Sequence, residues 1–151
     1  MSVKIIATNR KARHEYHILD KYEGGIVLHG SEVKAIREGR ANIKEAYVRF
    51  IENELFVIGM HIGKYSNAGY STHTPVRNRK LLLHRRELSK MRKMVDEKGK
   101  TLIPLSIYFK GGNVKVEFGL AQGKKLYDKR KAKMDKDVNR QVDRALKSYK
   151  N

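Results

Sequence analysis

The sequence predicts a mainly β protein of the α+β class, an OB-like antiparallel β-barrel with two or three helices and a basic C-terminal tail. Short apolar runs separated by glycine-rich or polar turns fill most of the chain. Before Gln122, apolar residues have helical spacing in two segments. After Gln122, no strand pattern remains. We therefore divide the 151 residues into a barrel at 1–122 and a tail at 123–151. An open α+β sheet has the same periodicity and is the alternative fold.

Apolar runs bounded by turn residues predict four strands in the first half of the chain. They are residues 16–19, 25–29, 45–51 and 55–62. A polar turn at 52–54 joins the last two runs and indicates a hairpin. Gly24 and Gly25 lie inside the strand pattern, where glycine marks a bulge or a close approach of another backbone.

A second hairpin is predicted at residues 102–121. Residues 111–113, Gly-Gly-Asn, separate two apolar runs, and glycine adopts the positive φ of a tight turn without steric cost. From 114 to 121, apolar residues alternate with polar or small ones, which predicts a strand with one buried face. Pro104, near the start of the hairpin, indicates an edge or a bulge.

Two helices are expected between the strands. Ser31 is a suitable N-cap for a short helix at 32–38, with Glu32 in its first turn. An apolar stripe at helical spacing predicts a second helix at 85–98. Residues 63–78 are rich in Gly, Ser, Thr and Asn and predict a long loop, which is typical of a functional or mobile segment.

The charge balance indicates a polyanionic partner. Lys and Arg number 34 against 16 Asp and Glu, which gives a formal net charge of +18. A compact chain with this surplus repels itself, and a polyanion relieves the repulsion. Nucleic acid is the first candidate and an anionic membrane surface is the second.

Composition argues against several kinds of site and location. The chain has no cysteine, so it has no disulfide, thiolate metal site or cysteine nucleophile. The six histidines lack an acidic ligand cluster, and neither a nucleotide-binding loop nor a carboxylate pair is present. No apolar run is long enough to span a bilayer or form a signal peptide. We expect a cytoplasmic monomer that is not an enzyme and uses no metal, cofactor or membrane.

Three basic segments support the prediction of a nucleic-acid surface: residues 9–14, residues 77–86 and the tail. A single basic segment is as consistent with a solvated face. Three segments on one small domain, with almost no compensating acidic residues nearby, favour a surface that contacts phosphate groups. Aromatic residues beside these segments are few, so stacking on bases is the weaker part of this argument.

The tail has the spacing of an amphipathic helix. A basic stripe lies opposite an apolar one. The basic residues are Lys133, Lys136, Arg140, Arg144 and Lys147, and the apolar ones are Met134, Val138, Val142, Ala145 and Tyr149. An isolated helix with few strong apolar residues is marginal in water, so we expect the tail to be helical when docked on a partner.

Six motifs resemble, in order and spacing, the tmRNA-binding small protein B family of bacteria. They are residues 7–16 (ATNRKARHEY), 22–26 (YEGGI), 30–34 (GSEVK), 39–42 (GRAN), 79–84 (RKLLLH) and 123–130 (GKKLYDKR). The resemblance covers nearly the whole chain. It implies a non-enzymatic partner of tmRNA in trans-translation, the rescue of ribosomes stalled on messages that lack a stop codon.

The resemblance also implies how RNA is bound. The barrel would hold the tRNA-like domain of tmRNA, with Glu23, Leu82 and His84 on the binding surface. Some members carry asparagine where His84 stands, and imidazole also donates a hydrogen bond or stacks. The expected tmRNA contacts are Asn9, Arg10, Arg13, His14, Glu23, Arg40, Lys80, Leu82 and His84.

By the same resemblance, the tail enters the empty mRNA channel of the small ribosomal subunit beyond the decoding centre. Gly123 would permit a bend there, and Tyr127 replaces a histidine of other members, since both rings can stack on a base. The expected ribosome contacts are Gly123, Lys124, Lys125, Tyr127, Asp128, Lys129, Arg130, Lys133, Lys136, Arg140 and Arg144. The alternatives are a general ribosome-associated structural RNA-binding protein and a small RNA-modifying enzyme.

Overall fold

The computed structural model of the chain describes residues 3–66, 74–96 and 99–124. Three helices and nine strands lie in these ranges. The helices are α1 (Arg10–Glu15), α2 (Gly30–Arg37) and α3 (Arg85–Val95). The strands are β1 (Val3–Thr8), β2 (Tyr16–Ile26), β3 (Ala41–Asn42), β4 (Tyr47–Ile51), β5 (Glu54–Ile58), β6 (His61–Ile62), β7 (Arg79–Leu82), β8 (Lys100–Lys110) and β9 (Asn113–Gly123).

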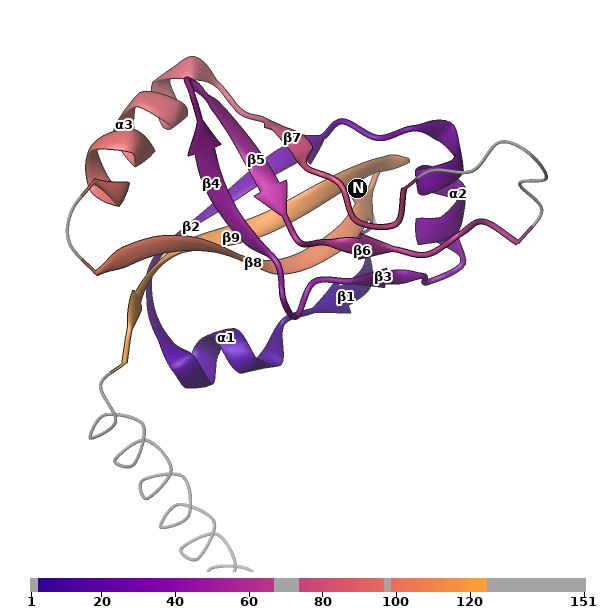
Figure 1. Cartoon of the computed structure of the whole chain (residues 1–151), viewed down its shortest axis with the longest axis horizontal. Coiled ribbons are helices and arrows are strands. Elements are labelled where there is room, and N and C mark those ends of the chain that lie inside the picture. Colours follow the sequence, from indigo (N-terminus) through magenta and orange to yellow (C-terminus); the bar gives the residue numbers. More distant parts are fainter. Residues whose placement is uncertain (1–2, 67–73, 97–98, 125–151) are drawn as a thin grey trace, which may run out of the picture.

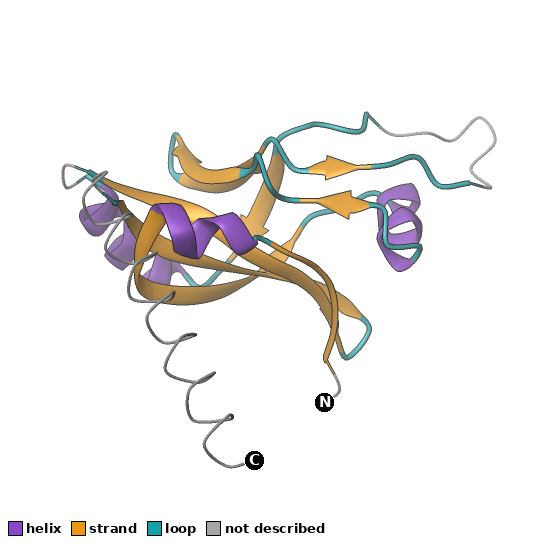
Figure 2. Cartoon of the chain, turned by 90° about the horizontal axis from the view of Figure 1, so that it is seen from below, coloured by secondary structure: helices purple, strands orange, loops and turns teal. Residues whose placement is uncertain are grey.

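Six of these strands close into an antiparallel barrel (Figure 1). Pairing runs from β8 through β4, β5, β7, β2 and β9, and β9 pairs with β8 again. β1 pairs with residues 106–110 of β8, whereas β4 meets β8 at Leu102. β3 and β6 form a separate two-stranded sheet beside the barrel (Figure 2). The predicted antiparallel barrel is confirmed, and the open sheet is wrong.

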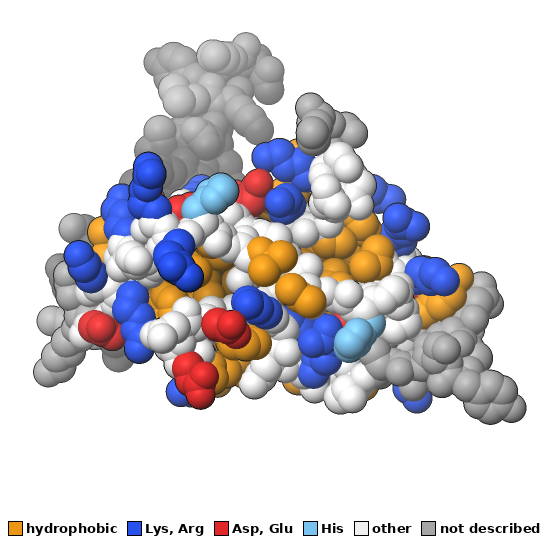
Figure 3. All heavy atoms as spheres, turned by 90° about the horizontal axis from the view of Figure 1, so that it is seen from above, with side chains coloured by type: hydrophobic (Ala, Val, Ile, Leu, Met, Phe, Trp, Pro, Cys, Tyr) orange, Lys and Arg blue, Asp and Glu red, His pale blue; other side chains and the backbone are white. Residues whose placement is uncertain are grey.

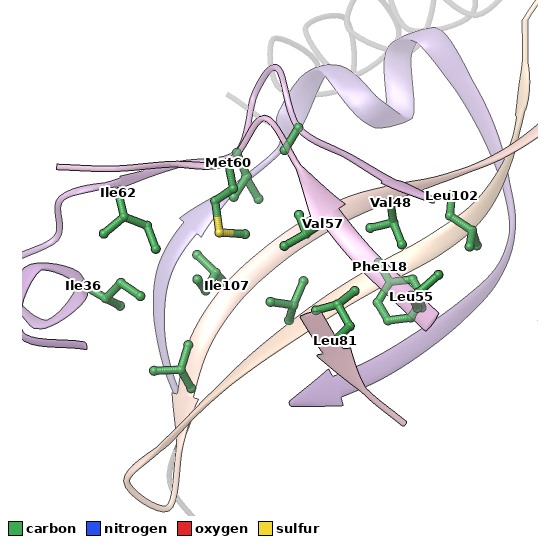
Figure 4. Close-up of a cluster of buried hydrophobic side chains, with 14 of the residues drawn as sticks. Ile36, Val48, Leu55, Val57, Met60, Ile62, Leu81, Leu102, Ile107 and Phe118 are labelled. Atoms are coloured by element: carbon green, nitrogen blue, oxygen red, sulfur yellow. The ribbon is translucent and has the colours of Figure 1, made fainter. Parts of the chain in front are cut away.

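The barrel interior is filled by aliphatic side chains around one phenylalanine. Figure 4 shows Val48, Leu55, Leu102 and Phe118 converging from different strands, and Phe118 has no exposed surface. Ile36 of α2 extends the same cluster toward β6. Burial of this much apolar surface is the main favourable term in folding. A smaller cluster, made of Ala12, Ile103, Leu105 and Ala121, joins α1 to β8 and β9.

β2 is one continuous strand, although two strands at 16–19 and 25–29 were expected. It pairs with β9 along its whole length from Tyr16 to Gly25 and tolerates a register shift between Ile18 and Asp20. Polar residues in its middle face outward and do not interrupt the pairing. A side chain at Gly24 would lie 2.8 Å from a methyl carbon of Leu83, so this glycine permits the close approach that the sequence indicated.

The second hairpin is confirmed in its main features. β8 and β9 pair from Lys100 to Gln122, with a register shift beside Pro104 that corresponds to the predicted bulge. Gly111 and Gly112 in the turn have φ values of 59° and 84°. The alternate apolar residues of β9 are buried as expected.

Several local predictions need correction. The strand expected at 55–62 is divided into β5 and β6, which belong to different sheets and are separated by Gly59 with a φ of 80°. α1 and β1 were not foreseen, because α1 is six residues long and buries only Ala12. α2 begins two residues earlier than expected, with His29 rather than Ser31 as its N-cap, because the Glu32 carboxylate accepts a hydrogen bond from the His29 backbone N–H at 2.8 Å. α3 ends at Val95 rather than at residue 98.

The described parts of the predicted loop at 63–78 contain an isolated bridge from Val76 to His61 and no helix. Residues 67–73 of this loop and residues 125–151 of the predicted tail lie outside the described residues. Within the described ranges, no helix combines the length and the apolar character that crossing a membrane requires.

Candidate nucleic-acid interface

Five neighbouring strands present one cross-strand row of residues on the outside of the barrel. The row is Ile5, Tyr108, Lys115, Gly25 and Leu82, each paired with the next. Along the four other strands, the residues on either side of each member are buried or half-buried, as expected where side chains alternate, whereas Lys4 beside Ile5 is exposed. Ile5 is 61% and Leu82 52% exposed, so no other described element covers the ends of the row. We call this row, together with Glu23 and Lys110, the outer face.

Glu23 supplies a carboxylate to the outer face, and its cross-strand partner Glu117 on β9 supplies a second one on the same side of the sheet. The Glu23 side chain reaches across β9 to β8, where the Tyr108 hydroxyl donates a short hydrogen bond to Oε2 and Lys110 Nζ lies 3.2 Å from Oε1. The Tyr108 hydrogen bond is the largest influence that lowers the pKa of Glu23, and Lys110 and Lys115 lower it further. Glu23 is therefore an ionised acceptor with a half-exposed side chain at neutral pH.

Leu82 and His84 lie at the end of β7, the other neighbour of β2. Leu82 pairs with Gly25, two residues from Glu23, and His84 follows the end of the strand. Gly25 has no side chain, so the surface between Leu82 and Lys115 is left low. His84 is exposed and precedes α3 as its N-cap residue. The structure thus places Leu82 on the strand beside the one that carries Glu23, and His84 just after the end of that neighbouring strand.

A basic groove begins beside Leu82. It has a volume of about 720 Å³ and lies between α3, β7 and the β4–β5 hairpin. Apolar residues form its floor, and the guanidinium of Arg92 lies 5.1 Å from the centre of the Phe50 ring. The Lys and Arg residues that line it are Lys80, Arg85, Arg92 and Lys93. Figure 3 shows one face of the molecule, on which Lys and Arg side chains lie around patches of hydrophobic ones.

The predicted contacts near the N-terminus divide into two kinds. Arg10, Arg13 and His14 are exposed on α1. Asn9 is only 8% exposed; its amide nitrogen donates to Pro104 O at 3.2 Å, and its backbone N–H donates to Leu105 O at 2.8 Å. Asn9 therefore holds α1 against β8, in contrast to its exposed neighbours.

Two further predicted contacts lie apart from the outer face. Arg40 is exposed after α2 and lies 3.6 Å from Glu38. Lys124 follows the last residue of β9, Gly123; its backbone N–H donates to Glu15 O at 2.9 Å and its Nζ donates to Arg13 O at 3.1 Å. The carbonyl groups at the C-terminal end of α1 thus fix the point where the tail leaves the barrel. The other predicted ribosome contacts lie outside the described residues: Lys125, Tyr127, Asp128, Lys129, Arg130, Lys133, Lys136, Arg140 and Arg144.

Comparison with known proteins identifies the family. A family model described as SmpB protein matches residues 6–148. The chain belongs to the SmpB protein family. An SsrA-binding protein of Syntrophobacter fumaroxidans is 52% identical over 95% of this chain and 89% of that protein. One of Carboxydothermus hydrogenoformans is 50% identical over 96% of this chain and 97% of that protein.

A solved structure of an SmpB-family protein has the same fold. It was described as "tmRNA-SmpB: a journey to the center of the bacterial ribosome". The superposition has a TM-score of 0.67 at 45% identity and covers 80% of this chain and 85% of that one. The family that the six sequence motifs suggested is therefore confirmed.

Part of this SmpB-family surface was not foreseen from the sequence. Tyr108 and Lys110 were not among the predicted contacts, because they are 85 and 87 residues from Glu23 and meet it only through the barrel. Their position two residues apart in a strand places them on one face, but only the register of β8 with β9 shows which face that is. The aromatic residues Tyr16 and Tyr22, which lie near basic residues in the sequence, pack against the core.

One basic segment of this SmpB-family chain is less free than expected. Arg79 is completely buried, and its Nε donates to Glu32 Oε2 at 2.6 Å. Arg77 donates to Glu32 Oε1 at 2.6 Å. Lys80 lies 3.1 Å from Glu54. The expectation of almost no compensating acidic residues was wrong here, because Glu32 and Glu54 come from distant parts of the sequence.

Proposed function

We propose that this SmpB-family protein is an RNA-binding adaptor that binds the tRNA-like domain of tmRNA and delivers it to stalled ribosomes for trans-translation. The outer face is the observation that supports this function most directly. It combines an ionised acceptor, Glu23, with exposed Leu82 and with Lys110 and Lys115, beside a groove lined by further basic residues. The cations of such a surface contact the RNA backbone. Its apolar side chain and its acceptor contact the bases or riboses.

The charge of the chain is suited to this role. Arg10 and Arg13 on α1 add cations away from the outer face. Contacts of Lys and Arg with phosphate release counterions, so affinity falls steeply with salt. Log affinity is expected to change by roughly 0.7–0.9 per unit of log salt for each phosphate contact. We place the protein in the cytoplasm, where ribosomes are, and assign it binding rather than catalysis.

The tail has a separate proposed role. Residues 125–151 would enter the empty mRNA channel of the small subunit and become helical there, with their basic stripe against ribosomal RNA. The bonds of Lys124 to Glu15 and Arg13 support a fixed starting point for this segment. A chain that ends after Gln122, without residues 123–151, is expected to bind tmRNA and to fail in tagging on stalled ribosomes. Loss of tmRNA binding in this shortened chain would show that the tail, and not the barrel, carries the tmRNA-binding surface.

Sequencing of the RNA that co-purifies with the protein from cells tests the main proposal. One dominant tmRNA species is expected. Bulk ribosomal RNA would instead indicate a general ribosome-associated protein, and an RNA carrying a new modification would indicate an enzyme. The same purification with Glu23→Ala is the comparison. The amount of tmRNA that co-purifies with this variant should fall, while the amount of purified protein stays the same.

A further inference from the structure

The Glu23 carboxylate is held from a strand that is not its neighbour. Glu23 lies on β2, and its partners Tyr108 and Lys110 lie on β8, beyond the whole width of β9. Tyr108 bonds to Oε2, and Lys110 Nζ lies 3.2 Å from Oε1 and 3.5 Å from Oε2. Three contacts from two residues fix both oxygen atoms, which a flexible glutamate on an open surface would not achieve alone.

The charged groups around Glu23 offset its negative charge. Lys110 faces it from β8 and Lys115 from β9, whereas Glu117 is its cross-strand partner on β9. His84 follows β7, the other neighbour of β2. Burial is the largest cause that raises the pKa of Tyr108, and the hydrogen bond to Glu23 raises it further, so the hydroxyl keeps its proton and remains a donor.

The position of Glu23 limits what it can recognise in RNA. A carboxylate repels phosphate, and an ionised one is only an acceptor. Each of its two oxygen atoms has more than one acceptor position, and the side chain is 39% exposed. The positions that Tyr108 and Lys110 leave open can therefore accept only from N–H or O–H groups, which RNA supplies on base edges and at the ribose 2′-hydroxyl.

We propose that Tyr108 and Lys110 are positioning residues that aim the free acceptor positions of Glu23 at N–H or O–H donors of the bound RNA, which makes Glu23 a reader of nucleosides rather than of phosphate. This inference rests on the proposed tmRNA-binding function and adds two residues to its site. A hydroxyl on β8 thereby sets the orientation of a contact on β2.

Tyr108→Phe removes the hydroxyl and keeps the ring, so it is the first test. Hydrogen bonds to charged groups are stronger than neutral ones. Affinity for the tRNA-like domain of tmRNA should fall by about three- to tenfold in this variant and by about tenfold or more in Glu23→Ala. The double variant should bind like Glu23→Ala alone, because Tyr108 acts only through Glu23. An additional loss in the double variant would overturn the inference.

Two control variants separate positioning from damage to the fold. Tyr22→Phe removes a hydroxyl that donates to Asp20 at 3.0 Å instead of to Glu23, and it should leave affinity unchanged. Lys110→Gln keeps a donor but removes the charge, so its loss should be smaller than that of Lys110→Ala. Equal losses in Tyr22→Phe and Tyr108→Phe would show a general effect on the barrel and would contradict the positioning role.

The pH profile of RNA affinity gives a readout that a purely structural residue would not change. Wild-type affinity should fall as pH drops through the lowered pKa of Glu23, because protonation removes an acceptor. In Tyr108→Phe this fall should begin at higher pH, since the strongest influence on that pKa is gone. Glu23→Gln retains every other titrating group of the protein and of the RNA, so the difference between its profile and that of the wild type isolates Glu23. Identical profiles for wild type and Tyr108→Phe would refute the inference.

Analogue interference identifies the donor in the RNA. Pools of the tRNA-like domain that carry random 2′-deoxy or inosine substitutions are partitioned by wild-type protein and by Glu23→Ala. Interference at a 2′-deoxy position that disappears with Glu23→Ala identifies a ribose hydroxyl, and the same result with inosine identifies the guanine amino group. If neither class differs between the two proteins, the donor proposal fails. Binding of unsubstituted RNA by wild-type protein would still support the adaptor function in that case.

Discussion

Two glutamates of this chain, Glu32 and Glu23, both pair with basic residues but lie in opposite environments. The Glu32 side chain has no exposed surface and bonds to Arg77, Arg79 and the backbone of His29. The Glu23 side chain is 39% exposed and bonds to Tyr108 and Lys110. The first arrangement leaves no acceptor facing solvent, whereas the second presents one. Burial, and not residue type or local charge, separates an ion pair that stabilises the fold from one that can contact a ligand.

The cluster around Glu32 joins segments that are far apart in the sequence. Arg79 also donates to Met60 O at 2.7 Å and to Pro75 O at 3.1 Å. Glu32 lies on α2, so one guanidinium connects this helix, the segment before β6 and the end of the loop at 63–78. These bonds satisfy a buried cation, and an unpaired one would be costly.

The largest effect is expected from Glu32→Ala, which leaves the buried Arg79 without its counter-charge. Breaking a buried pair from one side costs about 3–5 kcal/mol. The free energy of unfolding, measured with urea, should fall by about this amount. A loss below about 1 kcal/mol would show that Arg79 finds water or another partner. Glu54→Ala, which removes the partner of Lys80 at the surface, is the matched control.

A second effect concerns the acid stability of the fold. The pKa of Glu32 is affected most by burial, which raises it, but hydrogen bonds from Arg77, His29 and Arg79 outweigh burial and lower it overall. A lowered folded-state pKa means that the carboxylate stabilises the fold above its unfolded pKa, and that this contribution is lost as pH falls through the folded value. The unfolding free energy should therefore drop on acidification less steeply in Glu32→Gln than in wild type. Glu23→Gln should change this dependence less, because its pair is exposed.

The sequence was sufficient where a feature is local. Alternation in β9, the glycines of the β8–β9 turn and the bulge at Pro104 each depend on residues close together in the chain, and the structure has all of them. α1 could not be recognised, because six residues with one buried alanine leave no apolar stripe.

The candidate site was predictable in part. Glu23, Leu82 and His84 were predicted through motifs, and the pairing of β2 with β7 places Leu82 beside Gly25, two residues from Glu23. The partners that decide what each glutamate does could not be found, since Glu32 and Arg79 are 47 residues apart and Glu23 and Tyr108 are 85 apart. Hydrophobic periodicity gives the inward face of a strand, but it contains no information about which strand lies next to it.

The third prediction concerns Glu23, the exposed one of the two glutamates. Glu23→Ala should change the unfolding free energy by less than about 1 kcal/mol, because exposed ion pairs contribute little. Its affinity for tmRNA should fall by about tenfold or more, since an acceptor to RNA is lost. Glu117→Ala removes an equal charge from the same face and should not weaken binding. A weaker complex in Glu117→Ala would mean that net charge, and not the acceptor, explains the Glu23 result.

The smallest effect is expected at Lys80 and Glu54, an exposed pair at 3.1 Å on the edge of the basic groove. A double-mutant cycle on unfolding should give about 0.2–1 kcal/mol at most. Glu54 offsets part of the charge of Lys80 in the free protein. Glu54→Ala should therefore strengthen RNA binding by a factor of up to about three. This gain should disappear at 1 M salt, where screening acts over about 3 Å. If Glu54→Ala instead weakens binding, Glu54 accepts a hydrogen bond from RNA as Glu23 is proposed to do. Exposure alone would then identify which acidic residues of this surface contact RNA.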